Sequence, residues 1–283
     1  MSVLDNNLAL NIEKTIKYAE NLIDKGCHGV VFFGSTGQSQ LISLSEKIQL
    51  INLLPKSNYR DKFIIGTGLN SLVDNINLIK IAKSNGFNKF LIMPPAYYKY
   101  SDHDVINFYS RIIDEINECK IILYNFEKLS GYKFSIDCVE ELVKKFPSQI
   151  VGVKDSSYNL YENLKIDNFS VMPGSESKLL KGLELGCSGI ITATTNVTSI
   201  LARDVYDKFQ NGSDQSSNEK LCLVRSIFDK FNLISGLHTF MAQIDQDYQN
   251  LIPPLKLLNE NEKKIFFAEL QKLDFDFKHL KAA

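Results

Sequence analysis

The sequence predicts an α/β protein built as a (β/α)8 barrel and followed by a helical C-terminal extension. Seven short apolar runs, rich in β-branched residues, recur along the first two thirds of the 283-residue chain. None alternates between apolar and polar residues, which is typical of strands buried on both faces. Amphipathic helical stretches separate the runs, and the strand-to-strand spacing of roughly 20–33 residues is the size of one βα unit. Seven such units in series favour a barrel over an open sheet.

The elements follow from these patterns in chain order. The predicted strands cover residues 30–33, 63–66, 90–94, 121–125, 150–154, 169–172 and 189–192. The predicted helices before and between them cover residues 12–25, 44–54, 73–85, 104–119, 136–146 and 177–185. After residue 196 the strand signal ends, and helices are predicted over residues 199–210, 218–234, 239–248 and 261–273. We therefore predict a barrel domain of residues 1–212 and a C-terminal helical extension of residues 213–283.

The strand count is one short of eight. Only residues 1–10 precede the first predicted helix, and Asp5, Asn6 and Asn7 favour a turn there. The first barrel strand is therefore predicted to be short or missing, and a chain cut short at its N-terminus is one explanation.

Composition excludes several classes of function. The formal net charge of −1 gives no reason to expect binding to nucleic acid or to an anionic membrane. The five cysteines are scattered and the four histidines lack ligand spacing, so we expect neither a disulfide framework nor a metal site. No G-x-G-x-x-G follows the first predicted strand, which argues against a dinucleotide cofactor. Without a membrane span or a signal pattern, the expected location is the cytoplasm.

Lys154 stands at the end of the fifth predicted strand, behind apolar residues that include Ile150 and Val153. In barrels of this kind the working residues lie at the carboxyl ends of the strands and in the following loops. Apolar surroundings favour the neutral amine of a lysine, which is the nucleophile that attacks a carbonyl group. By position alone, Lys154 can also be a surface lysine at a strand end.

Hydroxyl groups follow two other predicted strands. Ser35 and Thr36 lie in a glycine-flanked turn at residues 34–37, where backbone N–H groups can hold a carboxylate. Tyr124 closes the fourth run, where a phenol can relay protons. Taken singly, the turn is also a plain strand-to-helix connection, and Tyr124 is also a core tyrosine. Together with Lys154, these residues predict a site that forms an imine with a keto acid.

At these positions the chain resembles the N-acetylneuraminate lyase and dihydrodipicolinate synthase family of class I, pyruvate-dependent aldolases. The similarity runs from about residue 4 to about residue 196 and rests on the joint order of several short motifs. These motifs are Gly34-Ser35-Thr36-Gly37, Leu44-Ser45-Glu46, Gly66-Thr67-Gly68, Pro95–Tyr98, Tyr124-Asn125, Ser130-Gly131 and Gly152-Val153-Lys154-Asp155.

The resemblance implies a (β/α)8 barrel, usually assembled as a homotetramer of tight dimers. It assigns the Schiff-base lysine to Lys154 and the proton-shuttling tyrosine to Tyr124. It also implies that Ser35 and Thr36 bind the pyruvyl carboxylate and complete the proton relay. It also implies that Tyr97 reaches into the site of a neighbouring subunit, with Tyr98 as the alternative. The remaining predicted substrate-binding residues are Gly37, Leu129, Ser156, Gly174, Glu176 and Ala193.

The second substrate is less closely defined by the resemblance. Dihydrodipicolinate synthases usually carry an arginine five residues after the catalytic tyrosine, and Leu129 occupies that position here. Leucine cannot hold the carboxylate of aspartate semialdehyde, and Lys128 offers only a point charge. Neuraminate lyases present Asp-Glu to the sugar after the seventh strand, of which Glu176 keeps one carboxylate. The run 154–156 is more similar to the 2-keto-3-deoxygluconate aldolases, and Glu127 replaces a proline found in most relatives.

We therefore predict a lyase that reversibly cleaves a 2-keto-3-deoxy sugar acid, or a similar polyol, to pyruvate and an aldehyde. The reaction proceeds through a covalent imine at Lys154 and needs no metal or organic cofactor. Three alternatives stay open. They are a 4-hydroxy-tetrahydrodipicolinate synthase that condenses pyruvate with aspartate semialdehyde, a dehydratase of the same family, and a non-catalytic scaffold that binds keto acids.

Overall fold

The computed structural model describes residues 1–116 and 118–277. Its contacts divide the chain into two compact units. The strand unit comprises Gly29–Gly174 and Lys181–Ile191 and holds all six strands found in the described residues. The helical unit comprises Met1–His28, Ser175–Leu180 and Thr192–Ala283. The predicted boundary after residue 212 divides the chain differently and stays a prediction.

The strand unit is built on one parallel sheet, in which the six strands pair in the order of the sequence. The strands are β1 (Val30–Phe32), β2 (Phe63–Gly66), β3 (Lys89–Ile92), β4 (Lys120–Asn125), β5 (Ile150–Asp155) and β6 (Ser170–Pro173). Residues such as Ile65, Phe90 and Val153 are fully buried, as expected for a sheet covered on both faces. The first six predicted strands are thereby confirmed, with ends that differ by at most two residues.

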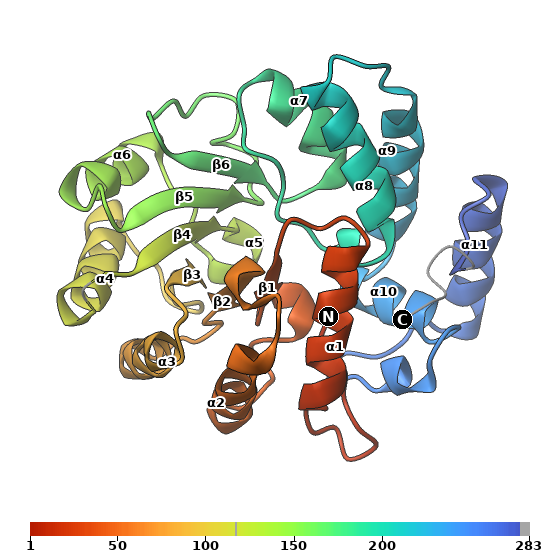
Figure 1. The fold of residues 1–283 in the computed structure, drawn as a ribbon, viewed down its shortest axis with the longest axis horizontal. Coiled ribbons are helices and arrows are strands. Elements are labelled where there is room, and N and C mark those ends of the chain that lie inside the picture. The colour runs from red at the N-terminus through yellow and green to blue at the C-terminus, as the bar shows by residue number, and fades with distance from the viewer. Residues whose placement is uncertain (117, 278–283) are drawn as a thin grey trace. The chain divides into compact units, whose positions relative to one another are not determined.

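Four helices connect β1 to β5 and lie along the outer side of the sheet (Figure 1). They are α2 (Leu44–Leu53), α3 (Leu72–Ser84), α4 (Asp102–Glu115) and α6 (Ile136–Lys145). Each follows a serine whose hydroxyl accepts a backbone N–H of the first turn, as in a standard N-cap. These predicted helices are confirmed, although the one expected over residues 104–119 ends at Glu115, and residue 117 lies outside the described residues.

The loop after β4 contains a short helix that the sequence pattern did not predict. Helix α5 (Glu127–Ser130) makes a single turn and ends at Gly131, which has a positive φ of 76°. Glycine adopts this left-handed conformation without strain and stops the helix there. The turn is too short to show a helical period in the sequence, yet it carries Leu129.

The seventh predicted strand, residues 189–192, is not a strand. The backbone N–H groups of Ser188 and Ile191 donate to the carbonyl groups of Val171 and Pro173, at 3.0 and 3.2 Å. This segment therefore runs beside β6 without a continuous ladder. Gly189 interrupts the extended backbone with a φ of 138°.

The helical unit begins without a strand before α1 (Ile12–Asp24) in the described chain. Val3 and Leu4 are fully buried, but Leu4 forms only one isolated antiparallel bridge, with Leu10. The prediction of a short or missing first strand is confirmed.

The later helices correct two predicted ranges. They are α7 (Leu179–Glu184), α8 (Thr195–Gln210), α9 (Ser216–Asp229), α10 (Leu233–Met241) and α11 (Glu260–Lys272). The helix expected over residues 218–234 is split because Asn232 accepts the N–H of Ser235 and starts α10. The helix expected over residues 239–248 is wrong, since Asp245 caps a separate 3₁₀ turn, η5 (Gln246–Gln249). None of the described helices combines the length and apolar character that a membrane span requires.

Candidate active site

Lys154 and Tyr124 lie directly opposite each other on neighbouring strands, because the register of β4 and β5 pairs these two residues. The side-chain nitrogen Nζ of Lys154 is 4.1 Å from the centre of the Tyr124 ring. Both residues are buried, with 7% and 4% of their surface exposed. The strand pairing therefore brings together a primary amine and a phenol, a nucleophile and a group that can transfer protons.

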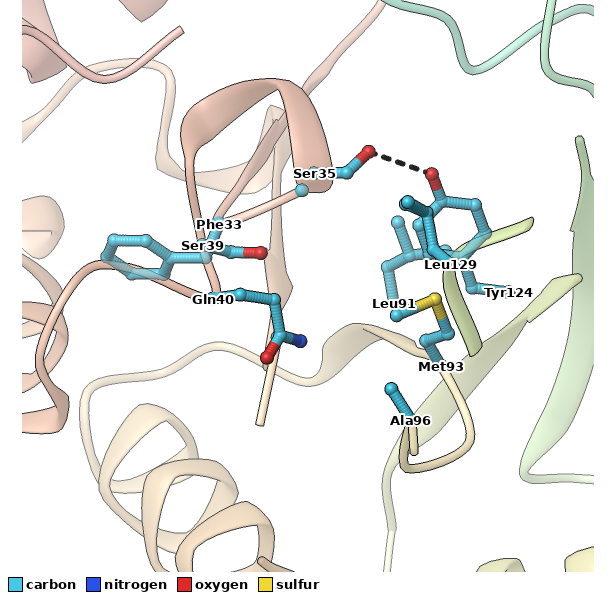
Figure 2. Close-up of a pocket in the computed structure, with 11 residues that line it drawn as sticks. Phe33, Ser35, Ser39, Gln40, Leu91, Met93, Ala96, Tyr124 and Leu129 are labelled. Atoms are coloured by element: carbon cyan, nitrogen blue, oxygen red, sulfur yellow. Dashed lines mark hydrogen bonds between the residues drawn. The ribbon is translucent and has the colours of Figure 1, made fainter. Parts of the chain in front are cut away.

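Ser35 joins this pair from the end of β1. It opens the 3₁₀ turn η1 (Ser35–Gly37), and its hydroxyl lies 3.0 Å from the hydroxyl of Tyr124. Figure 2 shows the two hydroxyl groups pointing toward each other across the pocket. The N–H of Gly37 donates to the carbonyl of Gly34 and closes the turn, which also contains Thr36. The hydroxyl groups of Ser35 and Tyr124, which are predicted to act together, therefore lie next to each other. One belongs to a turn and the other to the end of a strand.

The residues that follow the amine and the phenol hold both strand ends in place. Asn125 donates from Nδ2 to a carboxylate oxygen of Asp155 at 2.8 Å, and both side chains are fully buried. The Asp155 carboxylate also accepts the backbone N–H groups of residues 158, 160 and 161. A buried carboxylate needs this number of donors to offset its desolvation. The Asn125–Asp155 hydrogen bond joins the ends of β4 and β5. It therefore fixes Tyr124 and Lys154, which directly precede these two residues.

A pocket opens beside these residues within the strand unit. Its eleven lining residues are Phe33, Gly34, Ser35, Ser39, Gln40, Gly68, Leu91, Met93, Ala96, Tyr124 and Leu129 (Figure 2). None of these eleven side chains is charged. Leu129 lies close to the Tyr124 ring in this view and is 44% exposed. The polar groups that remain are hydroxyl groups and the amide of Gln40.

Two other predicted residues lie near the ends of β5 and β6. The backbone N–H of Gly174 donates to the carbonyl of Asp155 at 2.9 Å. A Cβ atom at Gly174 would lie 2.1 Å from the hydroxyl oxygen of Ser156, so only glycine fits there. Ser156 and Gly174 are therefore neighbours, although neither lines the pocket.

Glu176 and Ala193 belong to the helical unit. Glu176 is fully buried and forms an ion pair with Arg225 of α9, in which oxygen Oε2 lies 2.7 Å from the guanidinium. Thr192 donates to the same oxygen, and Oε1 has no hydrogen-bond partner in the described chain. Ala193 accepts two hydrogen bonds from Asn196 through its carbonyl group. The carboxylate predicted to face a sugar thus already has a cationic partner.

Tyr97 and Tyr98 lie on the surface of the strand unit. Tyr97 is 90% exposed, has a positive φ of 91°, and packs edge-to-face against the ring of Tyr98. Neither ring is buried, since Tyr98 is also 68% exposed. Neither residue reaches the Tyr124 pocket of its own chain.

Sequence reasoning missed Lys47, a fully buried lysine of α2. Its Nζ donates to the carbonyl groups of Thr67 and Gly68 at 2.8 and 3.2 Å and lies 5.7 Å from the centre of the Phe33 ring. Burial lowers the pKa of this ammonium group to about 8. The signal was weak, because a lysine in an amphipathic helix normally indicates a solvated face. Arg225 was missed for a similar reason, although arginine is rare in this chain.

Comparison with known proteins places this geometry in a family. The profile of the Dihydrodipicolinate synthetase family matches residues 1–273. The chain belongs to this family. Its members are class I, pyruvate-dependent lyases and aldolases, so this chain is an enzyme of that class.

Individual relatives share the fold at moderate identity. The chain is 29% identical over 253 residues to an uncharacterized DapA-like lyase of Chloroflexus aurantiacus, covering 86% of this chain and 84% of that protein. It is 28% identical over 279 residues to a 4-hydroxy-tetrahydrodipicolinate synthase of Methanopyrus kandleri, covering 95% and 92%. The crystal structure of YagE from E. coli K12 in complex with pyruvate superposes with a TM-score of 0.86 at 22% identity, covering 97% and 96% of the two chains. These likenesses confirm the predicted barrel fold.

Proposed function

We propose that this enzyme reversibly cleaves a 2-keto-3-deoxy sugar acid, or a similar polyol, to pyruvate and an uncharged aldehyde. The observation that carries the proposal is the uncharged lining of the pocket, to which both Leu129 and Tyr124 contribute. An aldehyde with its own carboxylate needs a cationic or multiple N–H partner, because an unpaired charge is costly to desolvate. Hydroxyl groups and the amide of Gln40 suit an aldehyde that carries hydroxyl groups.

In the proposed mechanism, Lys154 attacks C2 of the keto acid through Nζ. Loss of water from the resulting carbinolamine gives a protonated imine. The turn at residues 34–37 holds the C1 carboxylate through its N–H groups and through the hydroxyl groups of Ser35 and Thr36. No metal or organic cofactor takes part, because the imine itself accepts electrons.

Tyr124 then takes the proton of the C4 hydroxyl group, and the C3–C4 bond breaks. The electron pair of that bond moves into the imine, which becomes an enamine, while C4 leaves as the aldehyde. Protonation at C3 and hydrolysis release pyruvate and free Lys154. The Tyr124–Ser35 hydrogen bond of 3.0 Å supports the proton transfer, since it links the phenol to a second hydroxyl group.

We further propose that Tyr97 enters the site of a second copy in a homodimer or homotetramer. Its 90% exposure and the lack of contact with its own pocket support this role, with Tyr98 as the alternative. Gly37, Ser156, Gly174, Glu176 and Ala193 are proposed as further substrate contacts, on the family resemblance. Five free cysteines support a reducing location such as the cytoplasm.

A second candidate is 4-hydroxy-tetrahydrodipicolinate synthase, which would join pyruvate to aspartate semialdehyde. The name of the Methanopyrus kandleri relative favours this activity. The same amine, phenol and turn would serve the pyruvate half of both reactions. The two candidates differ only in what the Leu129 side of the pocket must hold.

Two experiments test the function in sequence. Purified enzyme is first incubated with pyruvate and sodium borohydride, and we expect a reduced pyruvyl adduct on Lys154 by peptide mass spectrometry. Products are then measured with 2-keto-3-deoxy sugar acids and, separately, with pyruvate plus aspartate semialdehyde. Release of pyruvate and an aldehyde from the sugar acids supports the aldolase. If only pyruvate plus aspartate semialdehyde is turned over, and no sugar acid is cleaved, the result favours the synthase. A keto product without free aldehyde would indicate a dehydratase.

A further inference from the structure

Lys47 is a buried charged group of the strand unit that the proposed mechanism leaves unused and that has no charged partner among the ion pairs of the described residues. Its side chain is fully buried, and it forms no ion pair within the described parts of the chain. Its hydrogen-bond acceptors are two backbone carbonyl groups, those of Thr67 and Gly68. Burying an ammonium group without an anion costs stability, and such costs are typically retained where function requires them.

The two carbonyl groups belong to a turn that packs against the pocket. A Cβ atom at Gly68 would lie 2.5 Å from the side chain of Ser39, and one at Gly66 would lie 2.7 Å from the carbonyl of Phe33. The N–H of Thr67 donates to the carbonyl of Leu91 at 3.2 Å. The turn held by Lys47 therefore approaches Phe33 and Ser39 closely, and these two residues flank the segment that contains Ser35.

The charge of Lys47 also lies close to the pocket. Nζ is 5.7 Å from the ring centre of Phe33 and 3.2 Å from the carbonyl of Gly68, and both residues line the pocket. None of the eleven lining residues is charged, so no anion among them neutralises this ammonium group. Burial lowers the pKa of the Lys47 ammonium group to about 8, so most of this group is protonated at neutral pH. A positive charge therefore lies behind the wall of the pocket at neutral pH.

We propose that Lys47 is a positioning residue for the keto-acid carboxylate. It acts through the Thr67–Gly68 turn, which fixes the carboxylate-binding turn at residues 34–37, and through its positive charge, which favours an anionic ligand. The inference rests on the proposed function, in which that turn binds the C1 carboxylate. It assigns to Lys47 the preference of the site for a charged keto acid over a neutral ketone.

The test compares pyruvate with methyl pyruvate, which has the same ketone but no charge. Each compound is titrated in the presence of cyanoborohydride, and the adduct on Lys154 is quantified by mass spectrometry. The variants are Lys47→Met, which keeps the length but loses the charge and the donors, and Lys47→Arg, which keeps both. Lys62→Met, an exposed lysine of the same unit, is the matched control.

We expect Lys47→Met to raise the half-saturating pyruvate concentration about tenfold or more, the loss of one charge-assisted interaction. Methyl pyruvate should change by less than about threefold, and Lys47→Arg should keep most of the preference for pyruvate. Lys62→Met should match the parent enzyme with both compounds.

Three results would overturn the inference. Equal weakening of both ketones by Lys47→Met would assign the residue a purely structural role. If Lys47→Met gives the same pyruvate titration as the parent enzyme, Lys47 has no role in binding the carboxylate. If Lys47→Met fails to fold, loss of the pyruvate preference in folded Lys47→Arg, which retains the charge, would reject the proposal. Absence of any adduct in the parent enzyme would instead reject the proposed function, and with it the role of Lys47.

Discussion

Nζ of Lys154 faces the ring of Tyr124 at 4.1 Å, and this contact is set by backbone pairing between β4 and β5. Because residues 124 and 154 are partners in the parallel ladder, the distance between amine and phenol does not depend on a flexible loop. The hydrogen bond between Asn125 and Asp155, one residue further on, holds the same two strand ends together. Sites built on paired strands keep their geometry better than sites on loops.

Tyr124→Phe should separate imine formation from bond cleavage. The variant keeps the ring beside Lys154 and removes only the hydroxyl that contacts Ser35. We expect cleavage of the sugar acid to slow by about 10²–10³-fold, the usual contribution of a general acid or base. Borohydride trapping of pyruvate on Lys154 should persist. Steady-state kinetics and adduct mass spectrometry measure the two effects, and equal loss of both would contradict the assigned role.

Leu129→Arg should shift the choice of aldehyde. The side chain lines the pocket and is 44% exposed, so a longer side chain has room to extend. An added guanidinium should improve kcat/KM for aspartate semialdehyde relative to a neutral aldehyde by roughly 10–100-fold, the value of a charge-assisted pair. Leu129→Met, which adds no charge, is the control. If the ratio of kcat/KM for aspartate semialdehyde to kcat/KM for the neutral aldehyde is the same in Leu129→Arg and Leu129→Met, the side chain at position 129 does not face the aldehyde.

Arg225→Met should destabilise the helical unit, because it leaves the buried carboxylate of Glu176 without its cation. Removing one partner of a buried ion pair costs about 3–5 kcal/mol. Glu176→Gln combined with Arg225→Met should recover part of this loss, since no unpaired charge remains. Urea unfolding of the single and double variants measures the coupling. Strictly additive losses would show that the two groups act independently.

His238 should make stability depend on pH. Its ring is fully buried, Nδ1 lies 2.9 Å from the carbonyl of Tyr248, and burial lowers its pKa to about 4. The unfolded chain binds this proton at a pKa near 6.5, so it takes up the proton first as the pH falls. The free energy of unfolding should therefore decrease between about pH 6.5 and pH 4, by up to roughly 3 kcal/mol.

Chemical unfolding at several pH values measures this slope. His238→Asn should flatten it, while His103→Asn, at an exposed position of α4, should leave it unchanged. An identical slope in the parent enzyme and in His238→Asn would show that other groups are responsible.

The strand ends were predictable from sequence because their signal is local. A short apolar run indicates a buried strand, and a polar residue such as Lys154 or Tyr124 at its end marks the carboxyl end, where functional residues lie. The helix starts at Asn232 and Asp245 were missed because their capping side chains lie inside stretches with a continuous apolar period. The strand predicted over residues 189–192 is wrong. The composition of this run is that of a strand, but strand pairing also depends on the backbone conformation of Gly189.

The sequence by itself determined the fold class, the family resemblance and the residue types at the strand ends, because parallel pairing brings those ends to one edge. Only the tertiary structure decided which polar groups are buried and what they contact. Lys47 has the local context of a solvated helical lysine, and its burial depends on how α2 meets the turn after β2. Glu176 has the context of a loop carboxylate, and its partner Arg225 lies 49 residues away in the chain. Contacts between residues so distant in sequence are fixed by packing, and no local pattern encodes them.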